Sequence, residues 1–197
     1  MMDIDFLLAN GATYKKIPRE NYVFHEGSAC SYYYQLVEGK IRWVNSSEAG
    51  KEFIQSIIEP GECFGELPLF DDLPYAANAL ADVDSVIIRL PKSTFIRLVK
   101  ENSSLLFAFT RLQAERLRFK FLLLKELTCY DPEHQIMMLI NYHKLHHKLN
   151  GNAPHRIDLT RQQIADMTGL RVETVIRAIK KLEHTGQLTI DKGKVYC

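Results

Sequence analysis

LTRQQIADMTGLRVETVIRAIKKL, residues 159–182, decides the fold of the C-terminal part of the chain. Thr160, with Gln163 three positions later, has the pattern of a capping box, which predicts the start of a helix. Gly169 marks a short turn, and a second helix is expected from Arg171 because apolar residues recur there every three or four positions. Two helices joined by a short glycine turn predict a helix-turn-helix.

A hairpin is expected directly after the second helix. Residues 188–190 and 194–196 have strand character and flank an Asp191-Lys192-Gly193 turn, which predicts a wing. Residues 129–197 are therefore expected to form a winged helix-turn-helix domain. The side chains placed to contact DNA phosphates are Thr160, Arg161, Gln162, Arg171, Thr174, Lys180, Lys192 and Lys194.

Glu173 and Arg177 lie four positions apart near the start of the second helix, where a recognition helix meets base edges. Arginine can bond bidentately to guanine, and glutamate can accept from the amino group of cytosine. The same spacing also suits an ion pair on the helix surface, so the spacing alone leaves both interpretations open. The surrounding helix-turn-helix and wing favour base reading.

Charge is distributed unevenly along the chain. Residues 1–91 carry 7 Lys/Arg against 14 Asp/Glu, residues 92–142 carry 8 against 5, and residues 143–197 carry 10 against 5. The net charges are −7, +3 and +5. Because cationic side chains drive nucleic-acid affinity, only the basic end is expected to meet a polyanion, although random surface charge is the alternative.

The N-terminal part, residues 1–101, predicts a small antiparallel barrel or sandwich. A short helix is expected over residues 3–10, and glycines recur at intervals of 12, 11 and 11 residues between segments rich in Val, Ile, Tyr and Phe. The candidate strands are residues 33–37, 41–45, 52–58 and 85–90. A second short helix is expected over residues 93–101. Together with the helical C-terminal part, this gives an α+β fold class.

Residues 102–128 predict one long helix without Pro or Gly from Leu105 onward. Its apolar positions alternate four- and three-residue steps, which indicates a seam for a second subunit. The seam residues are Leu105, Phe109, Leu112, Arg116, Phe119 and Leu123, with the arginine as an interruption. A second apolar surface on the same helix is expected to face the barrel, and an ordinary core helix is the alternative. Asp131-Pro132 predicts the start of the next helix.

Several functions are not expected from this sequence. Cys30, Cys63, Cys129 and Cys197 show no metal-binding spacing, so no metal site is expected, although a redox switch through one thiol stays open. No segment approaches the roughly 18 consecutive apolar residues of a membrane span. The chain is therefore expected in the cytoplasm, without a membrane partner.

The chain resembles the Crp/Fnr family of bacterial transcription regulators over essentially its whole length. Three stretches carry the resemblance: Phe24-His25-Glu26-Gly27 with Val37-Glu38-Gly39-Lys40, the cassette Pro60-Gly61-Glu62-Cys63-Phe64-Gly65-Glu66-Leu67-Pro68-Leu69-Phe70, and residues 159–162 with 173–177. The resemblance implies a double-stranded β-helix (jelly-roll-like) sensor, a dimerisation helix and a homodimer. It also implies a two-fold symmetric double-stranded DNA site, RNA polymerase as a partner and possible control by a small effector.

The resemblance also implies site residues. Glu173 and Arg177 match the family's base-reading residues, while Val172 stands where cyclic-AMP-responsive members have an arginine. Ile176 replaces a serine common in the Fnr branch. The effector-pocket candidates are Phe64, Gly65, Glu66, Leu67, Tyr75, Ala76, Ala77, Lys120 and Phe121.

The cassette departs from the cyclic-AMP-binding pattern. Those members hold the phosphate with Arg and Ser or Thr, where this chain has Pro74-Tyr75-Ala76-Ala77-Asn78. A buried phosphate without a cation is costly, so cyclic AMP is not expected and the effector is unidentified. No N-terminal cysteine cluster exists for an iron-sulfur centre, and the cofactor is unknown.

The sequence leaves alternatives open. Within a regulator, the roll is either an effector sensor, a degenerate sensor or a haem sensor using His25. A cupin-like barrel enzyme would need a His-x-His and Glu metal set, of which the roll has only His25, and no enzyme activity is expected. A cyclic-nucleotide-binding module without DNA binding is the third alternative, and the missing phosphate arginine disfavours it.

Overall fold

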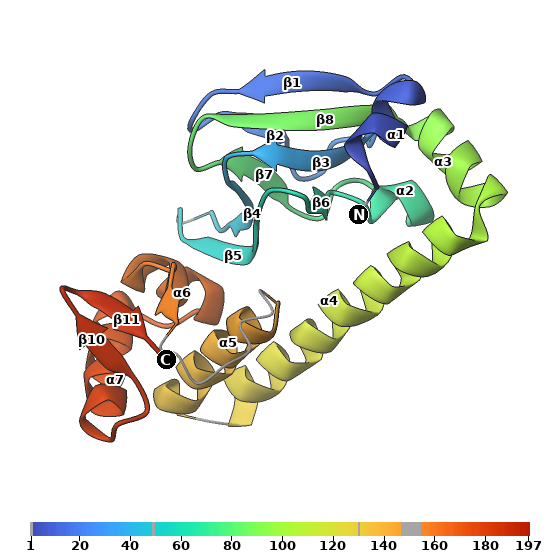
Figure 1. Cartoon of the computed structure of the whole chain (residues 1–197). Helices are drawn as coiled ribbons and strands as arrows, with labels where there is room; N and C mark the ends of the chain where they lie inside the picture. Colours follow the sequence, from blue (N-terminus) through green and yellow to red (C-terminus); the bar gives the residue numbers. More distant parts are fainter. Residues whose placement is uncertain (1, 49, 130, 147–154) are drawn as a thin grey trace. The chain divides into compact units, whose positions relative to one another are not determined.

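The structure, a computed structural model, describes residues 2–48, 50–129, 131–146 and 155–197. It divides into two compact units, Met1–Leu112 and Gln113–Cys197. The long helix α4 (Ser103–Cys129) begins in the first unit and ends in the second (Figure 1). Among the described residues, no helix is long and apolar enough to cross a membrane.

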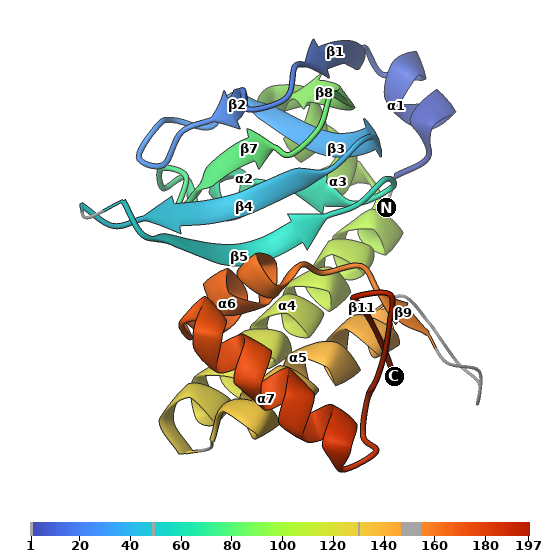
Figure 2. The ribbon, with the colours of Figure 1, turned by 90° about the vertical axis from the view of Figure 1, so that its left-hand side faces the viewer.

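The first unit contains two four-stranded antiparallel sheets and three short helices (Figure 1). One sheet has the strand order β1-β8-β3-β6 and the other β2-β7-β4-β5, so that β5 forms an edge next to β4 (Figure 2). The bounds are α1 Ile4–Ala9, β1 Thr13–Ile17, β2 Tyr22–Phe24, β3 Tyr32–Glu38, β4 Ile41–Ser46, β5 Glu52–Ile58, β6 Cys63–Phe64, α2 Pro68–Asp71, β7 Asn78–Ala81, β8 Ser85–Pro91 and α3 Lys92–Glu101.

The core of the first unit has two parts, because successive side chains of a strand point to opposite faces of its sheet. Tyr34 and Leu36 of β3 pack between the two sheets. Tyr33 faces the other way and packs with Leu7 of α1 and Phe95 of α3. The apolar residues between the sheets therefore occupy the interior of the roll, where an effector pocket was predicted.

The second unit combines the end of α4 with a helical domain and a small sheet. Its bounds are α5 Pro132–His146, β9 Arg156–Ile157, α6 Arg161–Thr168, α7 Val172–His184, β10 Thr189–Asp191 and β11 Lys194–Tyr196. Asp131 caps α5 as predicted, because its carboxylate accepts a hydrogen bond from the backbone N–H of His134 at 3.0 Å. The sheet has the order β10-β11-β9.

The predicted α+β class is confirmed: antiparallel sheets, a long helix and a C-terminal winged helix-turn-helix follow one another along the chain. Several details differ from the prediction. In the roll, β1, β2, β6 and β7 and the helix α2 were not among the predicted segments. The second helix of the helix-turn-helix begins at Val172, because Arg171 is extended and serves as its N-cap. The short strand β9 was not predicted, and it pairs with β11 through Ile157 and Val195.

Candidate DNA interface and effector pocket

The helix-turn-helix is fixed by local hydrogen bonds and by an apolar interior. The Thr160 hydroxyl accepts from the N–H of Gln163 at 3.1 Å, and the Gln163 side chain accepts from the N–H of Thr160 at 2.9 Å. This reciprocal capping box starts α6. Gly169, at φ +72°, supplies the left-handed turn between α6 and α7, a conformation that glycine adopts at least cost.

Helix α7 has one buried face and one exposed face. The buried residues are Val175, Ala178, Ile179 and Leu182. Glu173 and Arg177 lie on the exposed face, one turn apart. Neither side chain forms an ion pair with any residue in the described ranges, including the other. The surface ion pair that the spacing also allowed is therefore not formed, and both charged groups stay available to a ligand.

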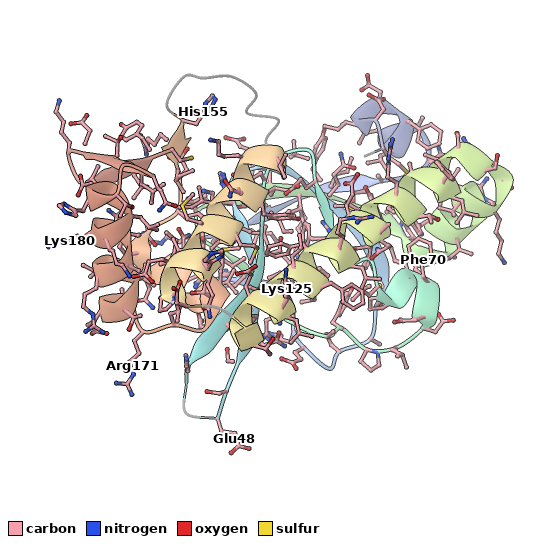
Figure 3. The ribbon with its side chains drawn as sticks, turned by 90° about the horizontal axis from the view of Figure 1, so that it is seen from below. Glu48, Phe70, Lys125, His155, Arg171 and Lys180 are labelled. Atoms are coloured by element: carbon pink, nitrogen blue, oxygen red, sulfur yellow. The ribbon has the colours of Figure 1, made fainter. Side chains whose placement is uncertain are left out.

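The predicted phosphate contacts fall into two groups. Arg171, Lys180, Lys192 and Lys194 are exposed, and Figure 3 shows Arg171 and Lys180 projecting away from the helical unit. The other group has more local roles: Thr160 caps α6, the Gln162 side chain donates to Asp166 at 2.8 Å, and Arg161 and Thr174 are half-buried. Lys180 is on the exposed side of α7 with Glu173 and Arg177, and Lys192 and Lys194 belong to the wing.

The wing is a three-stranded element whose tip carries the two predicted lysines. Asp191 pairs with Lys194 across the hairpin, and Lys192 and Gly193 form the tip with φ of +45° and +76°. Lys192 holds a left-handed backbone that non-glycine residues adopt rarely, and this conformation closes the hairpin tightly. Both lysines thus stand at the exposed end of the wing.

The interior of the roll is occupied by aromatic rings of the chain itself. Phe24 stacks on Tyr75, with ring centroids 3.7 Å apart and planes 9° apart. Phe64 packs against Tyr34 at 5.6 Å and against Phe24 at 6.0 Å. Burial, reinforced by the neighbouring Cys30 thiol, raises the pKa of the Tyr75 phenol, so the ring is neutral at physiological pH.

Gly65 of the cassette makes this packing possible. Its φ is +65°, and a Cβ built on it would lie 2.6 Å from the Phe24 ring and 3.1 Å from the Tyr75 ring. Any side chain at this position would displace one of the rings. Of the predicted pocket residues, Phe64, Glu66, Tyr75 and Ala77 are buried, whereas Leu67 and Ala76 are exposed.

Two further pocket candidates, Lys120 and Phe121, belong to the second unit on α4. Phe121 is exposed and Lys120 is half-buried. Burial, together with the like charge of Arg116, lowers the pKa of Lys120 to about 8. Phe121 is therefore better placed to meet another molecule than to line a closed pocket.

Of the six residues predicted as the dimer seam, three are buried within the chain itself. Phe109 packs against Tyr33, Phe70 and Phe95, with ring centroids 5.1–6.0 Å apart. Phe119 stacks on Tyr142 at 3.8 Å. Leu123 is also buried, and Leu105, Leu112 and Arg116 are half-buried. Three of the six predicted seam residues therefore pack within the chain itself, and a different face of α4 is considered below for the contact between subunits.

A different apolar stripe of α4 is exposed. It follows the heptad spacing of a coiled coil, with steps of three and four residues, through Phe107, Thr110, Ala114, Leu117, Phe121, Leu124 and Thr128. Phe107, Leu117, Phe121 and Leu124 are 72%, 57%, 64% and 59% exposed. We call these seven residues the outer stripe. Its aromatic and leucine side chains form an apolar surface without a cover.

Candidate metal ligands do not cluster in the part of the chain that the structure describes. Within these ranges, no group of three or more His, Cys, Asp or Glu side chains could hold a metal ion. His25 is exposed and stacks on Tyr22 with ring centroids 4.3 Å apart. Cys63 is buried, while Cys30 and Cys197 are half-buried free thiols. The side chain of Cys129 lies outside the described residues.

Comparisons with known proteins agree with this division into a roll and a helix-turn-helix. Residues 14–102 match the cyclic nucleotide-binding domain, and residues 135–196 match the Crp-like helix-turn-helix domain. The cAMP-activated global transcriptional regulator CRP of Pasteurella multocida is 28% identical over 170 residues, which cover 85% of this chain and 81% of that protein.

Solved structures share the fold. FixK2 from Bradyrhizobium japonicum has a TM-score of 0.78 at 20% identity, covering 94% of this chain and 91% of that one. The c-di-GMP responsive global regulator CLP of Xanthomonas campestris has a TM-score of 0.75 at 19% identity, covering 98% and 96%.

A roll of the cyclic nucleotide-binding type followed by a winged helix-turn-helix defines a transcription regulator, and not an enzyme. The chain belongs to the Crp/Fnr family. Regulators of this family bind DNA and act as dimers. The cupin-like enzyme is not favoured.

Proposed function

We propose that this regulator binds a two-fold symmetric duplex as a homodimer, with α7 of each subunit in the major groove. The single observation that carries the proposal is the exposed face of α7, where Glu173 and Arg177 have no ion-pair partner among the described residues while the opposite face is buried. A helix with this division presents its charged groups to base edges when it lies in the groove.

Each of the two charged groups matches one base of a G·C pair. The Arg177 guanidinium can donate two hydrogen bonds to O6 and N7 of guanine, and the Glu173 carboxylate can accept from the N4 amino group of cytosine. Val172, half-buried at the start of α7, offers no hydrogen bond and adds only an apolar contact. We expect a G·C pair at the core of each half-site.

The exposed cations position the domain without reading sequence. Arg171, Lys180, Lys192 and Lys194 can neutralise phosphates on both sides of the groove, and Thr160, Arg161, Gln162 and Thr174 are shorter-range candidates for the same backbone. The net charge of +5 over residues 143–197 supports this role.

For the homodimer, we propose that the outer stripe of α4 pairs with the same stripe of a second copy. Three observations support this pairing. The stripe has heptad spacing, four of its large apolar side chains are exposed, and the other apolar side of α4 packs within its own chain. An isologous pairing of this kind produces the two-fold axis that a symmetric DNA site needs.

We propose that cyclic AMP is not the effector of this protein. The stacked rings of Phe24, Tyr75 and Phe64 fill the space between the sheets, and Pro74-Tyr75-Ala76-Ala77-Asn78 contains no cation for a phosphate. A small effector of another kind would have to displace Tyr75 or bind elsewhere on the roll. If none exists, the roll is a degenerate sensor.

The remaining parts of the proposal follow from the regulator class. The division into a sensor domain (1–101), a dimerisation helix (102–128) and a DNA-binding domain (129–197) gives each function a continuous segment of the chain. RNA polymerase is proposed as a further partner, and the cytoplasm is proposed as the location of the protein.

Selection of bound duplexes from a random library by the purified, ligand-free protein tests the proposal. We expect enrichment of a two-fold symmetric site with half-sites about one helical turn apart and a G·C pair in each core. The double variant Glu173→Ala, Arg177→Ala is the matched control and should enrich no such site. Enrichment of an asymmetric site would contradict the proposal that the protein binds DNA as a homodimer. If nothing is enriched, repeating the selection with small molecules from cell extract separates an effector-dependent regulator from a wrong proposal.

A further inference from the structure

Ile176 is the one large aliphatic residue that is exposed among the described residues of α7. It is 41% exposed, whereas Val175, Ile179 and Leu182 are buried. An isolated apolar side chain on a surface is common and by itself indicates nothing. The position of Ile176 on the helix gives it a more specific meaning.

Ile176 lies inside the face that carries the base-reading groups. Residues three and four positions apart share one side of a helix, so Glu173, Ile176, Arg177 and Lys180 form a single exposed row. Ile176 is a direct neighbour of both Glu173, one turn before it, and Lys180, one turn after it. A helix that brings Glu173 and Arg177 to base edges therefore also brings the branched side chain of Ile176 into the groove.

The base edges of the major groove offer one apolar group. Guanine, adenine and cytosine present acceptors and amino groups there, while thymine adds a C5 methyl. An isoleucine over a purely polar edge would remove water from donors and acceptors without replacing their hydrogen bonds, which is unfavourable. Against a thymine methyl, the same side chain buries apolar surface on both partners.

We infer that Ile176 is a specificity-determining residue that reads the C5 methyl group of a thymine in each half-site. The inference rests on the proposed function of α7 as the recognition helix and adds a third readable position to the G·C pair read by Glu173 and Arg177. It predicts a T·A pair beside that G·C pair. A 5-methylcytosine carries the same methyl group and should substitute for this thymine in contact with Ile176.

The test removes only the methyl group. In the duplex obtained by selection, each thymine is replaced in turn by deoxyuridine in both half-sites, and the dissociation constant is measured for the wild type and for Ile176→Ala. At one symmetric position, the wild type should lose about four-fold in affinity per half-site, the effect of one buried methyl-sized group. Ile176→Ala should bind the thymine and deoxyuridine duplexes equally.

Two control variants make the result specific. Ile176→Val keeps a branched side chain and should keep most of the preference for thymine. Lys180→Ala removes a charge from the same row and should weaken binding to the thymine and deoxyuridine duplexes equally. The ratio of the two dissociation constants should therefore keep its wild-type value. Both changes are at exposed positions, so circular dichroism should show that the helices are retained.

The outcomes separate the inference from the function on which it rests. A symmetric site that tolerates deoxyuridine everywhere, or a methyl preference that persists in Ile176→Ala, overturns the role of Ile176 and leaves the DNA-binding proposal standing. A protein that selects no specific site under any ligand condition overturns both.

Discussion

The ring of Phe24 lies face to face with the ring of Tyr75, with centroids 3.7 Å and planes 9° apart, inside the roll. Tyr75→Ala should therefore leave a cavity between the sheets and lower the free energy of unfolding by about 3 kcal/mol or more. Tyr75→Phe keeps the ring and should cost much less. Chemical denaturation of both variants measures the difference, and equal losses would show that the hydroxyl, rather than the stack, stabilises the roll.

Cyclic AMP should not stabilise the wild-type protein. A ligand that binds only the folded state raises the unfolding midpoint in proportion to the logarithm of its concentration. Because the rings of Phe24, Phe64 and Tyr75 occupy the roll, we expect the same thermal midpoint with and without millimolar cyclic AMP, and no heat of binding by calorimetry. A saturable increase would contradict the proposal that cyclic AMP is not the effector.

Charged substitutions in the outer stripe should separate the subunits. Leu117→Glu or Phe121→Glu places a carboxylate in the apolar seam and should yield monomers with weakened binding to a symmetric site. Leu145→Glu is the matched control, because this leucine of α5 is also exposed but lies outside the stripe. Sedimentation gives the mass of each variant. A dimer mass for both stripe variants would exclude the outer stripe as the interface.

Arg177→Ala should lower affinity for the selected site by about 1–3 kcal/mol, with little effect on random duplex, because the arginine reads a base. Lys192→Ala is the comparison. It removes a proposed phosphate contact, so it should weaken binding to the selected and the random duplex alike. The slope of log affinity against log salt concentration should fall by about one. Titrations at several salt concentrations distinguish the two patterns. Equal losses of Arg177→Ala on both duplexes would exclude base reading.

Thr160→Ala should destabilise the helix-turn-helix by about 1 kcal/mol, because it removes the hydroxyl that caps α6. Thr160→Ser retains the hydroxyl and should restore most of the loss. Urea denaturation measures the free energy of unfolding of both variants. A neutral effect of the alanine would mean that tertiary packing alone holds the start of α6.

Lys120 should make stability depend on pH at alkaline values. Its pKa in the folded chain is about 8, whereas an unfolded lysine titrates near about 10.4. Between these values the unfolded chain binds more protons, so the contribution of Lys120 to stability rises with pH. Lys120→Met should be more stable than the wild type at pH 7, and this advantage should shrink by pH 10. Parallel pH profiles of the two proteins would contradict the lowered pKa.

Local signals in the sequence predicted much of the fold. The caps at Thr160 and Asp131 are set by residues three positions apart, so neighbouring letters contain the information. The strands β3, β4, β5 and β8 of the roll follow from their composition and from the spaced glycines, whereas β1, β2, β6 and β7 were not predicted. The strand β9 was not predicted because it has only two residues and depends on pairing with β11, which is distant in the sequence.

The free face of α4 could not be predicted in the same way. α4 carries two apolar stripes with similar spacing of their apolar residues. The periodicity of the sequence does not show which of the two stripes packs against the rest of the chain. The choice depends on Tyr33, Phe95 and Tyr142, which meet Phe109 and Phe119 only after the chain has folded. The filled roll interior escaped prediction for the same reason, because the stack of Phe24 on Tyr75 joins residues 51 positions apart.

The two apolar sides of α4 separate folding from assembly. Substitutions in the outer stripe can change how tightly two copies associate while Phe109 and Phe119 keep their packing within the chain. If the dimer is the DNA-binding form, occupancy of a target at low expression rises with the square of the number of molecules in the cell. The affinity between copies then sets the expression level at which a gene responds, and selection can adjust this threshold without altering the operator or the helix that reads it.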